Sequence, residues 1–143
     1  MASEDVIARK LLELGASPEL ANRVARLVQL VSYSKEVKAR SQPESEIEYL
    51  KVFTDNPELA IVQDADRLDA IGAIGIARTF AFAGARGNPL YGEGKKACLK
   101  HFDDKLLHLE SLMKTGSGRE CARTRTERLR TFKEWMIEEM QGL

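Results

Sequence analysis

The feature that most constrains the fold of this chain is an apolar run, residues 61–77, that also contains three aspartates and one arginine. Moving an unpaired carboxylate out of water costs several kcal/mol. The side chains of Asp64, Asp66 and Asp69 must therefore be paired, hold a metal ion or face a cleft. This run predicts an element that is both part of the core and a carrier of polar chemistry.

The helix that contains this run is expected to extend from about residue 57 to residue 83. Asp55-Asn56-Pro57-Glu58 is a helix start, with a capping side chain before a proline at the first helical position. At 1.5 Å per residue the helix would be about 40 Å long. Its apolar residues occur nearly all round, so we expect a long, central, buried helix. Gly72 and Gly75 would permit a close helix crossing or leave room for a ligand.

The remaining segments also favour helices, because no stretch shows the alternating pattern of a strand. Helices are expected near residues 3–14, 17–31, 44–53, 95–114 and 119–140. Polar composition predicts loops near 35–40 and 84–94. Since 143 residues suffice for one core, we expect a single all-α domain, residues 1–143, built as a helical bundle around the central helix.

The charge balance and the cysteine content indicate which binding partners and which cell compartment suit the chain. The 22 basic and 22 acidic residues cancel, so nothing favours a nucleic acid or an anionic membrane. The arginines near residues 119–130 alternate with glutamates, as on a solvated helix face. Two separated cysteines suit a reducing compartment, so we expect a cytoplasmic protein, with a nuclear location also open. No apolar run approaches the roughly 20 residues of a membrane span.

The aspartates are open to two interpretations. Residues three apart share a helix face, so Asp66 and Asp69 line up, whereas Asp64 lies nearer Arg67. The aligned pair could serve as a metal ligand plus a general base. Alternatively, the pair could bind arginines or cap backbone groups.

Two cations carry similar alternatives. Lys105 lies one helical turn from both histidines of the chain and could contact an anionic substrate or remain at the surface. Arg86 lies in an expected loop and could reach a phosphate, or the loop could be a plain connector.

Residues 62–78 resemble the signature of the HD-domain metal-dependent phosphohydrolases, within a small group that includes nucleotide pyrophosphohydrolases. The resemblance covers most of the chain and extends to several shorter motifs: Ser32-Tyr33-Ser34, Asn88-Pro89-Leu90-Tyr91, His101-Phe102 with Lys105-Leu106-Leu107, and Leu112-Met113 with Thr115. It implies an all-α bundle and hydrolysis of nucleotides or other phosphate esters or anhydrides with a divalent metal, manganese or magnesium.

The resemblance also assigns roles to residues. The family takes its metal ligands from an early histidine, a His-Asp pair and a final aspartate, and the Ala-Asp-Arg-Leu pattern places that final ligand at Asp66. Asp69 would orient water or substrate as the catalytic carboxylate. Arg78, Arg86 and Lys105 would meet the phosphate oxygens of the substrate.

The chain departs from the family at the other metal ligands. Its histidines, His101 and His108, both follow the signature and neither precedes an aspartate. We therefore expect an incomplete, N-terminally truncated HD-like domain with little or no activity alone. The alternative is a non-catalytic helical interaction module. A homodimer or a partner chain would then cover the apolar surface that the missing helices leave bare.

Overall fold

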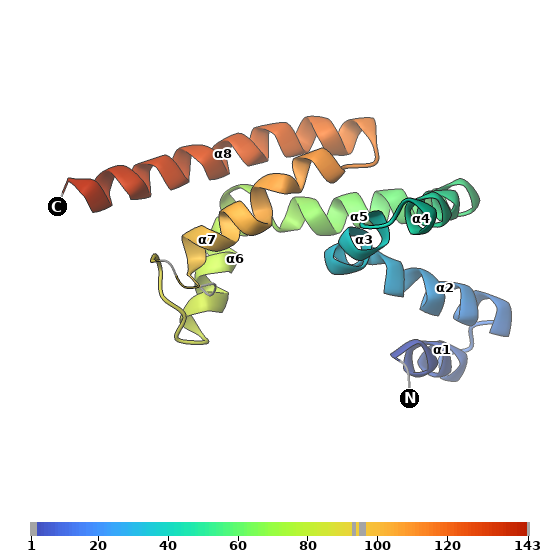
Figure 1. Cartoon of the computed structure of the whole chain (residues 1–143). Coiled ribbons are helices and arrows are strands. Elements are labelled where there is room, and N and C mark those ends of the chain that lie inside the picture. The colour runs from blue at the N-terminus through green and yellow to red at the C-terminus, as the bar shows by residue number, and fades with distance from the viewer. Residues whose placement is uncertain (1–2, 93, 95–96, 143) are drawn as a thin grey trace. The chain divides into compact units, whose positions relative to one another are not determined.

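The computed structural model describes residues 3–92, 94 and 97–142, and every regular element in these ranges is helical (Figure 1). The all-α prediction is confirmed. The helices are α1 (Ser3–Glu13), α2 (Pro18–Val31), α3 (Tyr33–Arg40), α4 (Pro43–Asp55), α5 (Glu58–Asp69), α6 (Gly72–Gly84), α7 (Cys98–Asp104) and α8 (Gly116–Gln141), with 3₁₀ turns at Leu106–His108 and Glu110–Leu112. No helix in the described part of the chain is long and apolar enough to cross a membrane.

Local capping explains several helix starts. The Ser17 hydroxyl accepts a hydrogen bond from the Leu20 amide at 3.2 Å, and Pro18 occupies the first turn of α2. The Thr115 hydroxyl accepts from the Gly118 amide at 2.9 Å and begins α8. The start of α8 therefore precedes the expected start at residue 119 by one turn.

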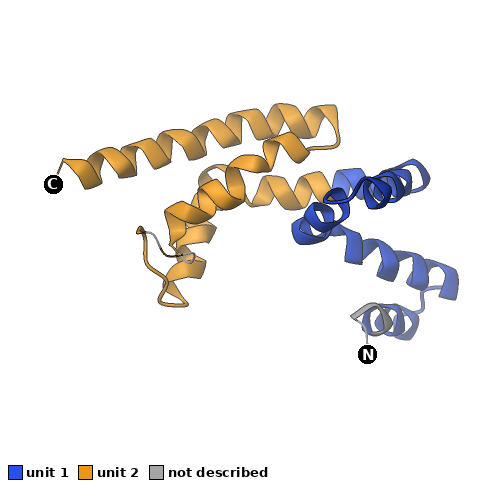
Figure 2. Cartoon of the chain, in the orientation of Figure 1, with its two compact units in different colours: residues 1–62 blue, residues 63–143 orange. Residues whose placement is uncertain are grey.

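Residue contacts divide the chain into two compact units, residues 1–62 and 63–143 (Figure 2). The division falls inside α5, so the signature run lies mostly in the second unit. The single domain expected over residues 1–143 stays a prediction.

Unit 1 contains α1 to α4 and the first turn of α5. Helices α1 and α2 pack together, with Ala21 and Ala25 fully buried. Arg23 of α2 forms an ion pair with Glu58 and donates to the Asn56 side chain at 3.2 Å. The segment expected as a loop near 35–40 is the short helix α3, which packs against α2 and α4. That prediction was wrong because tertiary packing overrides weak local propensity.

Unit 2 is organised around α6, α7 and α8. The rings of Phe80, Phe102 and Phe132, one from each of these helices, pack with centroids 5.7–6.2 Å apart. Leu106 and Leu129 are buried in the same unit. The helix expected over 95–114 is shorter, because α7 ends at Asp104 and two 3₁₀ turns follow it.

The continuous central helix over 57–83 was also a wrong prediction. Helix α5 ends at Asp69 and α6 begins at Gly72, whose φ of +74° lies in the left-handed region that favours glycine. Between them Ile71 adopts an extended backbone and buries its side chain almost fully. The helix is not buried all round either, since Ile61 and Ile74 are 64% and 63% exposed. The break allows α6 to pack on α8.

Candidate functional site

The three aspartates of the signature run have three different environments. Asp64 is 3% exposed and accepts hydrogen bonds from the amides of Lys114 and Thr115, each at 2.8 Å, and from the Thr115 hydroxyl at 2.7 Å. It thereby ties α5 to the turn that begins α8. Gly118 packs directly against this carboxylate, and a β-carbon there would overlap Asp64 Oδ2. Asp64 is therefore an anchor of the fold.

Asp69 lies at the end of α5 and forms an ion pair with Arg78 of α6. The guanidinium of Arg78 also donates to the Asp69 backbone carbonyl at 3.3 Å. The structure thus brings together a residue expected to be catalytic and a residue expected to bind substrate. Both side chains are about 60% exposed, so the pair contributes little to stability. The pair instead fixes the position of Arg78 beside the break between α5 and α6.

Asp66, expected as the metal ligand, is exposed on α5. Among the described residues, no group of three or more His, Cys, Asp or Glu side chains could hold a metal ion. The donor set of this part of the chain therefore does not fit a divalent metal centre by itself. Asp66 remains one accessible carboxylate on the same helix as Asp64 and Asp69.

A cavity of about 490 Å³ opens in unit 2 beside the Asp69–Arg78 pair. Its walls come from the helix break, α6, the 84–94 segment and α7. The residues that line it are Ala70, Gly75, Arg78, Thr79, Phe82, Ala83, Asn88, Cys98, His101, Lys105 and Leu106. Arg78 and Lys105, two residues expected to bind substrate, therefore share one cavity. A cavity lined by two cations and a histidine complements an anion that also presents an apolar surface.

Arg86, the third expected substrate-binding residue, is not among the residues that line this cavity. Its guanidinium carbon lies 3.6 Å from the ring centroid of Phe82, which does line the cavity. A cation over an aromatic face is a favourable arrangement. Arg86 thus lies next to the cavity, behind an aromatic wall residue, and its contact with substrate stays a prediction.

His101 also lines the cavity, although the sequence assigned it no role in the site. Burial lowers the pKa of His101 below the ordinary 6.5, and the positive charge of Lys105 lowers it further, against an opposing effect of Asp104. Burial likewise raises the pKa of the Cys98 thiol, so this cysteine is not an activated nucleophile. His101 and Lys105 line the same cavity, as expected from their spacing of one helical turn.

The lowered pKa of His101 predicts a pH effect on folding. An unfolded chain binds a proton at His101 more readily than the folded chain does, so its contribution favours folding above pH 6.5 and is lost as the pH falls below that value. The free energy of unfolding, measured by urea titration at pH 7.5 and 5.5, should fall more for wild type than for His101→Asn.

The matched control is His108→Asn, because His108 is exposed on the following 3₁₀ turn. It should show the same pH dependence as wild type. An equal change in the His101 and His108 variants would contradict the assignment of the effect to the cavity histidine.

The chain is similar in sequence to a known bacterial protein. No protein-family model matches the chain. The chain is 38% identical over 134 residues to YpgQ of Bacillus subtilis, covering 94% of this chain and 60% of that protein. It therefore spans about three-fifths of the length of this curated relative.

Solved structures give a consistent result. A crystal structure of Bacillus subtilis YpgQ in complex with ADP matches with a TM-score of 0.73 at 34% identity, covering 99% of this chain and 66% of that one. An HD-superfamily hydrolase from Bacillus thuringiensis matches with a TM-score of 0.58 at 31% identity, covering 99% of this chain and 84% of that one.

Proposed function

We propose, on the premise that this chain belongs to the HD superfamily of hydrolases, that it binds the phosphate groups of a nucleotide or another small phosphorylated compound in the unit 2 cavity. The reaction it serves is metal-dependent hydrolysis of a phosphate ester or anhydride. One observation carries the proposal: Arg78, His101 and Lys105 line a single cavity, and the carboxylate of Asp69 pairs with Arg78 there.

Some cavity residues contact the phosphate groups of the ligand, and others contact the rest of the ligand. The guanidinium of Arg78 offers paired donors to phosphate oxygens, and Lys105 supplies a second positive charge at the same cavity. The Phe82 ring, with Arg86 on it, offers an apolar face to a base or another ring. YpgQ, a relative of this chain, has been crystallised with ADP, which combines both kinds of group.

Asp69 acts in this proposal as a positioning residue. Its carboxylate holds Arg78 at the cavity, so it influences phosphate binding through the guanidinium. In the reaction the same carboxylate is available to orient water. Asp66 is proposed as a metal ligand, as the family resemblance implies.

The described residues do not form a complete metal site by themselves. A divalent metal would supply Lewis-acid stabilisation of phosphate charge. No group of donors in the described part of the chain is large enough to hold it, so further ligands have to come from elsewhere. We therefore propose weak or no turnover for this chain by itself, and we assign phosphate binding as the activity it retains.

Calorimetric titration with ADP in metal-free buffer tests the binding site. Arg78→Ala and Lys105→Ala should each weaken ADP binding about tenfold, which corresponds to about 1.4 kcal/mol and is typical of one charge-assisted contact. Arg26→Ala is the matched control, because Arg26 is an exposed cation of α2 in unit 1. It should bind ADP as wild type does.

Two results would change the proposal. Wild-type affinity in both cavity variants would remove the cavity from the function. Robust nucleotide hydrolysis by the purified chain with manganese, abolished in Asp66→Ala, would show that the chain completes a working metal site.

A non-catalytic interaction module is the second candidate function. Apolar side chains favour it, since α2 and the first turn of α5 enclose a groove of about 240 Å³ lined largely by leucine and valine. A chain that shows no ADP binding but associates with itself or a partner would support this candidate.

A further inference from the structure

The cavity of unit 2 has two chemically different ends. One end lies at the break between α5 and α6, where Asp69 pairs with Arg78. We call the other the loop end, because α6 passes there into the 84–94 segment and α7 begins (Figure 1). Four cavity residues define the loop end: Phe82, Ala83, Asn88 and Cys98. None of the four carries a charge, so this end is suited to an uncharged part of a ligand.

Backbone hydrogen bonds fix the loop end. The Asn88 amide donates to the Ala83 carbonyl at 2.9 Å, in the last turn of α6. The Cys98 amide, at the start of α7, donates to the Pro89 carbonyl at 3.0 Å. The chain that follows α6 is therefore tied to the ends of both helices, and Asn88 and Cys98 lie at the same end of the cavity as Ala83.

The two cations of the cavity lie away from the loop end along their own helices. Arg78 precedes Phe82 by one helical turn, which is a rise of about 6 Å along α6. Lys105 follows Cys98 by two turns, which is about 10 Å along α7. A ligand that reaches both ends therefore carries its negative charge about the length of a sugar ring away from its uncharged part.

Phe82 has one ring face available to a ligand. The guanidinium carbon of Arg86 lies 3.6 Å from the ring centroid and occupies the other face. Arg86 is not among the residues that line the cavity, whereas Phe82 is, so the face opposite Arg86 is the one that the cavity reaches. The cation and the ring attract each other, and a flat aromatic group on the available face would complete a stack.

Asn88 offers a polar contact beside this ring. Its side chain is partly buried and forms no hydrogen bond with any described residue. An amide presents a donor and an acceptor side by side, and adenine presents the complementary pair, a 6-amino group next to a ring nitrogen. Ala83 and Cys98 are both buried and leave the rest of this end apolar. The loop end thus matches a flat ring with one polar edge.

We propose that the loop end is a nucleobase subsite, in which the base stacks on Phe82 and Asn88 binds its amino-bearing edge. Arg86 is a positioning residue there: it holds the ring from the far side and does not contact phosphate, in contrast to its expected role. The subsite rests on the proposed function, since it takes phosphate binding by Arg78 and Lys105 as its premise. It adds the residues that select a nucleotide over a phosphate compound without a base.

Calorimetric titration with ADP and with pyrophosphate, both in metal-free buffer, separates the two ends. Wild type should bind ADP about tenfold more tightly, because only ADP carries a base. Phe82→Leu keeps an apolar side chain but removes the ring, so it should weaken ADP binding about tenfold and leave pyrophosphate binding unchanged. Arg86→Ala should weaken ADP binding about threefold and also leave pyrophosphate unchanged. Arg78→Ala should weaken both ligands by the same factor.

A second nucleotide tests Asn88. Purine riboside 5′-diphosphate has the ring system and the phosphates of ADP but lacks the 6-amino group. Wild type should bind it about fivefold more weakly than ADP, because one hydrogen bond is lost. Asn88→Ala should bind the two nucleotides equally. A wild-type chain that does not distinguish them would overturn the contact between Asn88 and the base.

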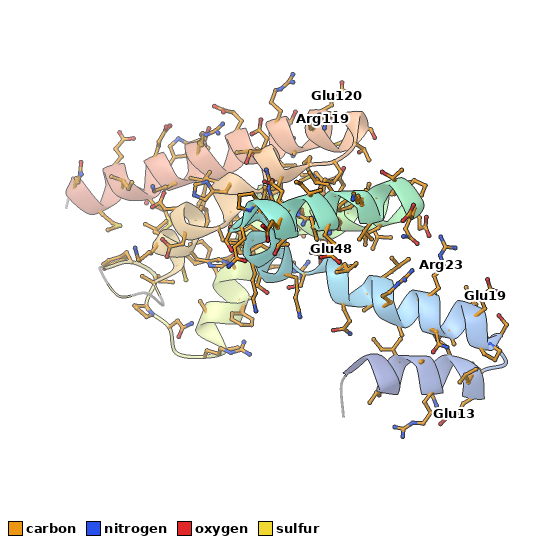
Figure 3. The ribbon with its side chains drawn as sticks, turned by 45° about the vertical axis from the view of Figure 1, so that its right-hand side comes forward. Glu13, Glu19, Arg23, Glu48, Arg119 and Glu120 are labelled. Carbon is orange, nitrogen blue, oxygen red and sulfur yellow. The ribbon has the colours of Figure 1, made fainter. Side chains whose placement is uncertain are left out.

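Two variants serve as matched controls. Tyr91→Leu removes another exposed aromatic side chain of the 84–94 segment. Arg119→Ala removes another exposed arginine of unit 2, which Figure 3 labels on α8. Neither residue is among those that line the cavity, so both variants should bind ADP and pyrophosphate as wild type does.

The outcomes distinguish the subsite from the proposed function. Equal wild-type affinity for ADP and pyrophosphate, or equal losses of both ligands in Phe82→Leu, would overturn the nucleobase subsite and leave phosphate binding in place. Equal losses of both ligands in Arg86→Ala would overturn the positioning role of Arg86. Binding of neither ligand to wild type would overturn the subsite and the proposed function together.

Discussion

Replacing Asp64 with alanine is expected to destabilise unit 2 by about 3 kcal/mol or more. The substitution removes a buried carboxylate that accepts three hydrogen bonds and leaves the amides of Lys114 and Thr115 without their acceptor. Hydrogen bonds to a charged group contribute about 1.5–3 kcal/mol each, and a donor left unsatisfied adds its desolvation cost. Urea unfolding at pH 7.5, followed by circular dichroism, measures the change.

Two further variants separate this mechanism from a general effect of removing an aspartate. Asp66→Ala, two residues away on the exposed face of α5, should change the free energy of unfolding by less than about 0.5 kcal/mol. Asp64→Asn keeps one acceptor oxygen and should fall between Asp66→Ala and Asp64→Ala. Equal stability of the two alanine variants would contradict the anchoring role of Asp64.

The second large effect is expected at Gly75. A β-carbon at this position would overlap the carbonyl group of Ala70, where the backbone passes the start of α6. Backbone cannot move aside as a flexible side chain can, so Gly75→Ala should cost about 3 kcal/mol by forcing the break between α5 and α6 to shift. Because Ala70 and Gly75 both line the cavity, ADP binding should weaken as well.

The same substitution at the other end of α6 supplies the control. A β-carbon at Gly84 would meet no atom within 4 Å, and its backbone is not in the left-handed region. Gly84→Ala should therefore be neutral or stabilise the protein by up to about 1 kcal/mol, through helix propensity and a less flexible unfolded chain. Opposite signs for the two glycines in one unfolding assay are the expected result. Similar changes in stability at both glycines would contradict a special role for the close approach at Gly75.

Helix type could be predicted from the sequence because the signals for it are local. Ser17-Pro18 and the apolar residues that follow define α2, and Thr115 caps α8 through a hydrogen bond that spans only three residues. The segment at 35–40 lacked such a signal, since its helix has weak amphipathic character and depends on packing against α2 and α4. Capping and periodicity therefore predict a helix where they are present and say little where they are absent.

The candidate site could be predicted only in part. The sequence singled out Arg78 and Lys105, and the structure places both on one cavity. It assigned no role to His101, because a histidine on a helix carries no sign of what faces it. Binding of Asp69 to an arginine was one of the open alternatives, but Arg78 could not be named as the partner, because nine residues separate them and the helix turns between them.

The sequence by itself determined that the chain is helical, because helix signals are local. It also determined that the aspartates of the signature run must be paired, hold a metal ion or face a cleft, because the cost of burying a charge depends on its immediate surroundings. Only the tertiary structure decided what each aspartate does. The partners of Asp64 lie 50 and 51 residues further along the chain. The path of α6 depends on the backbone reversal at Gly72 and on the close approach of Gly75 to Ala70. Contacts between distant segments follow from how side-chain volumes and hydrogen bonds are satisfied together, which no local pattern records.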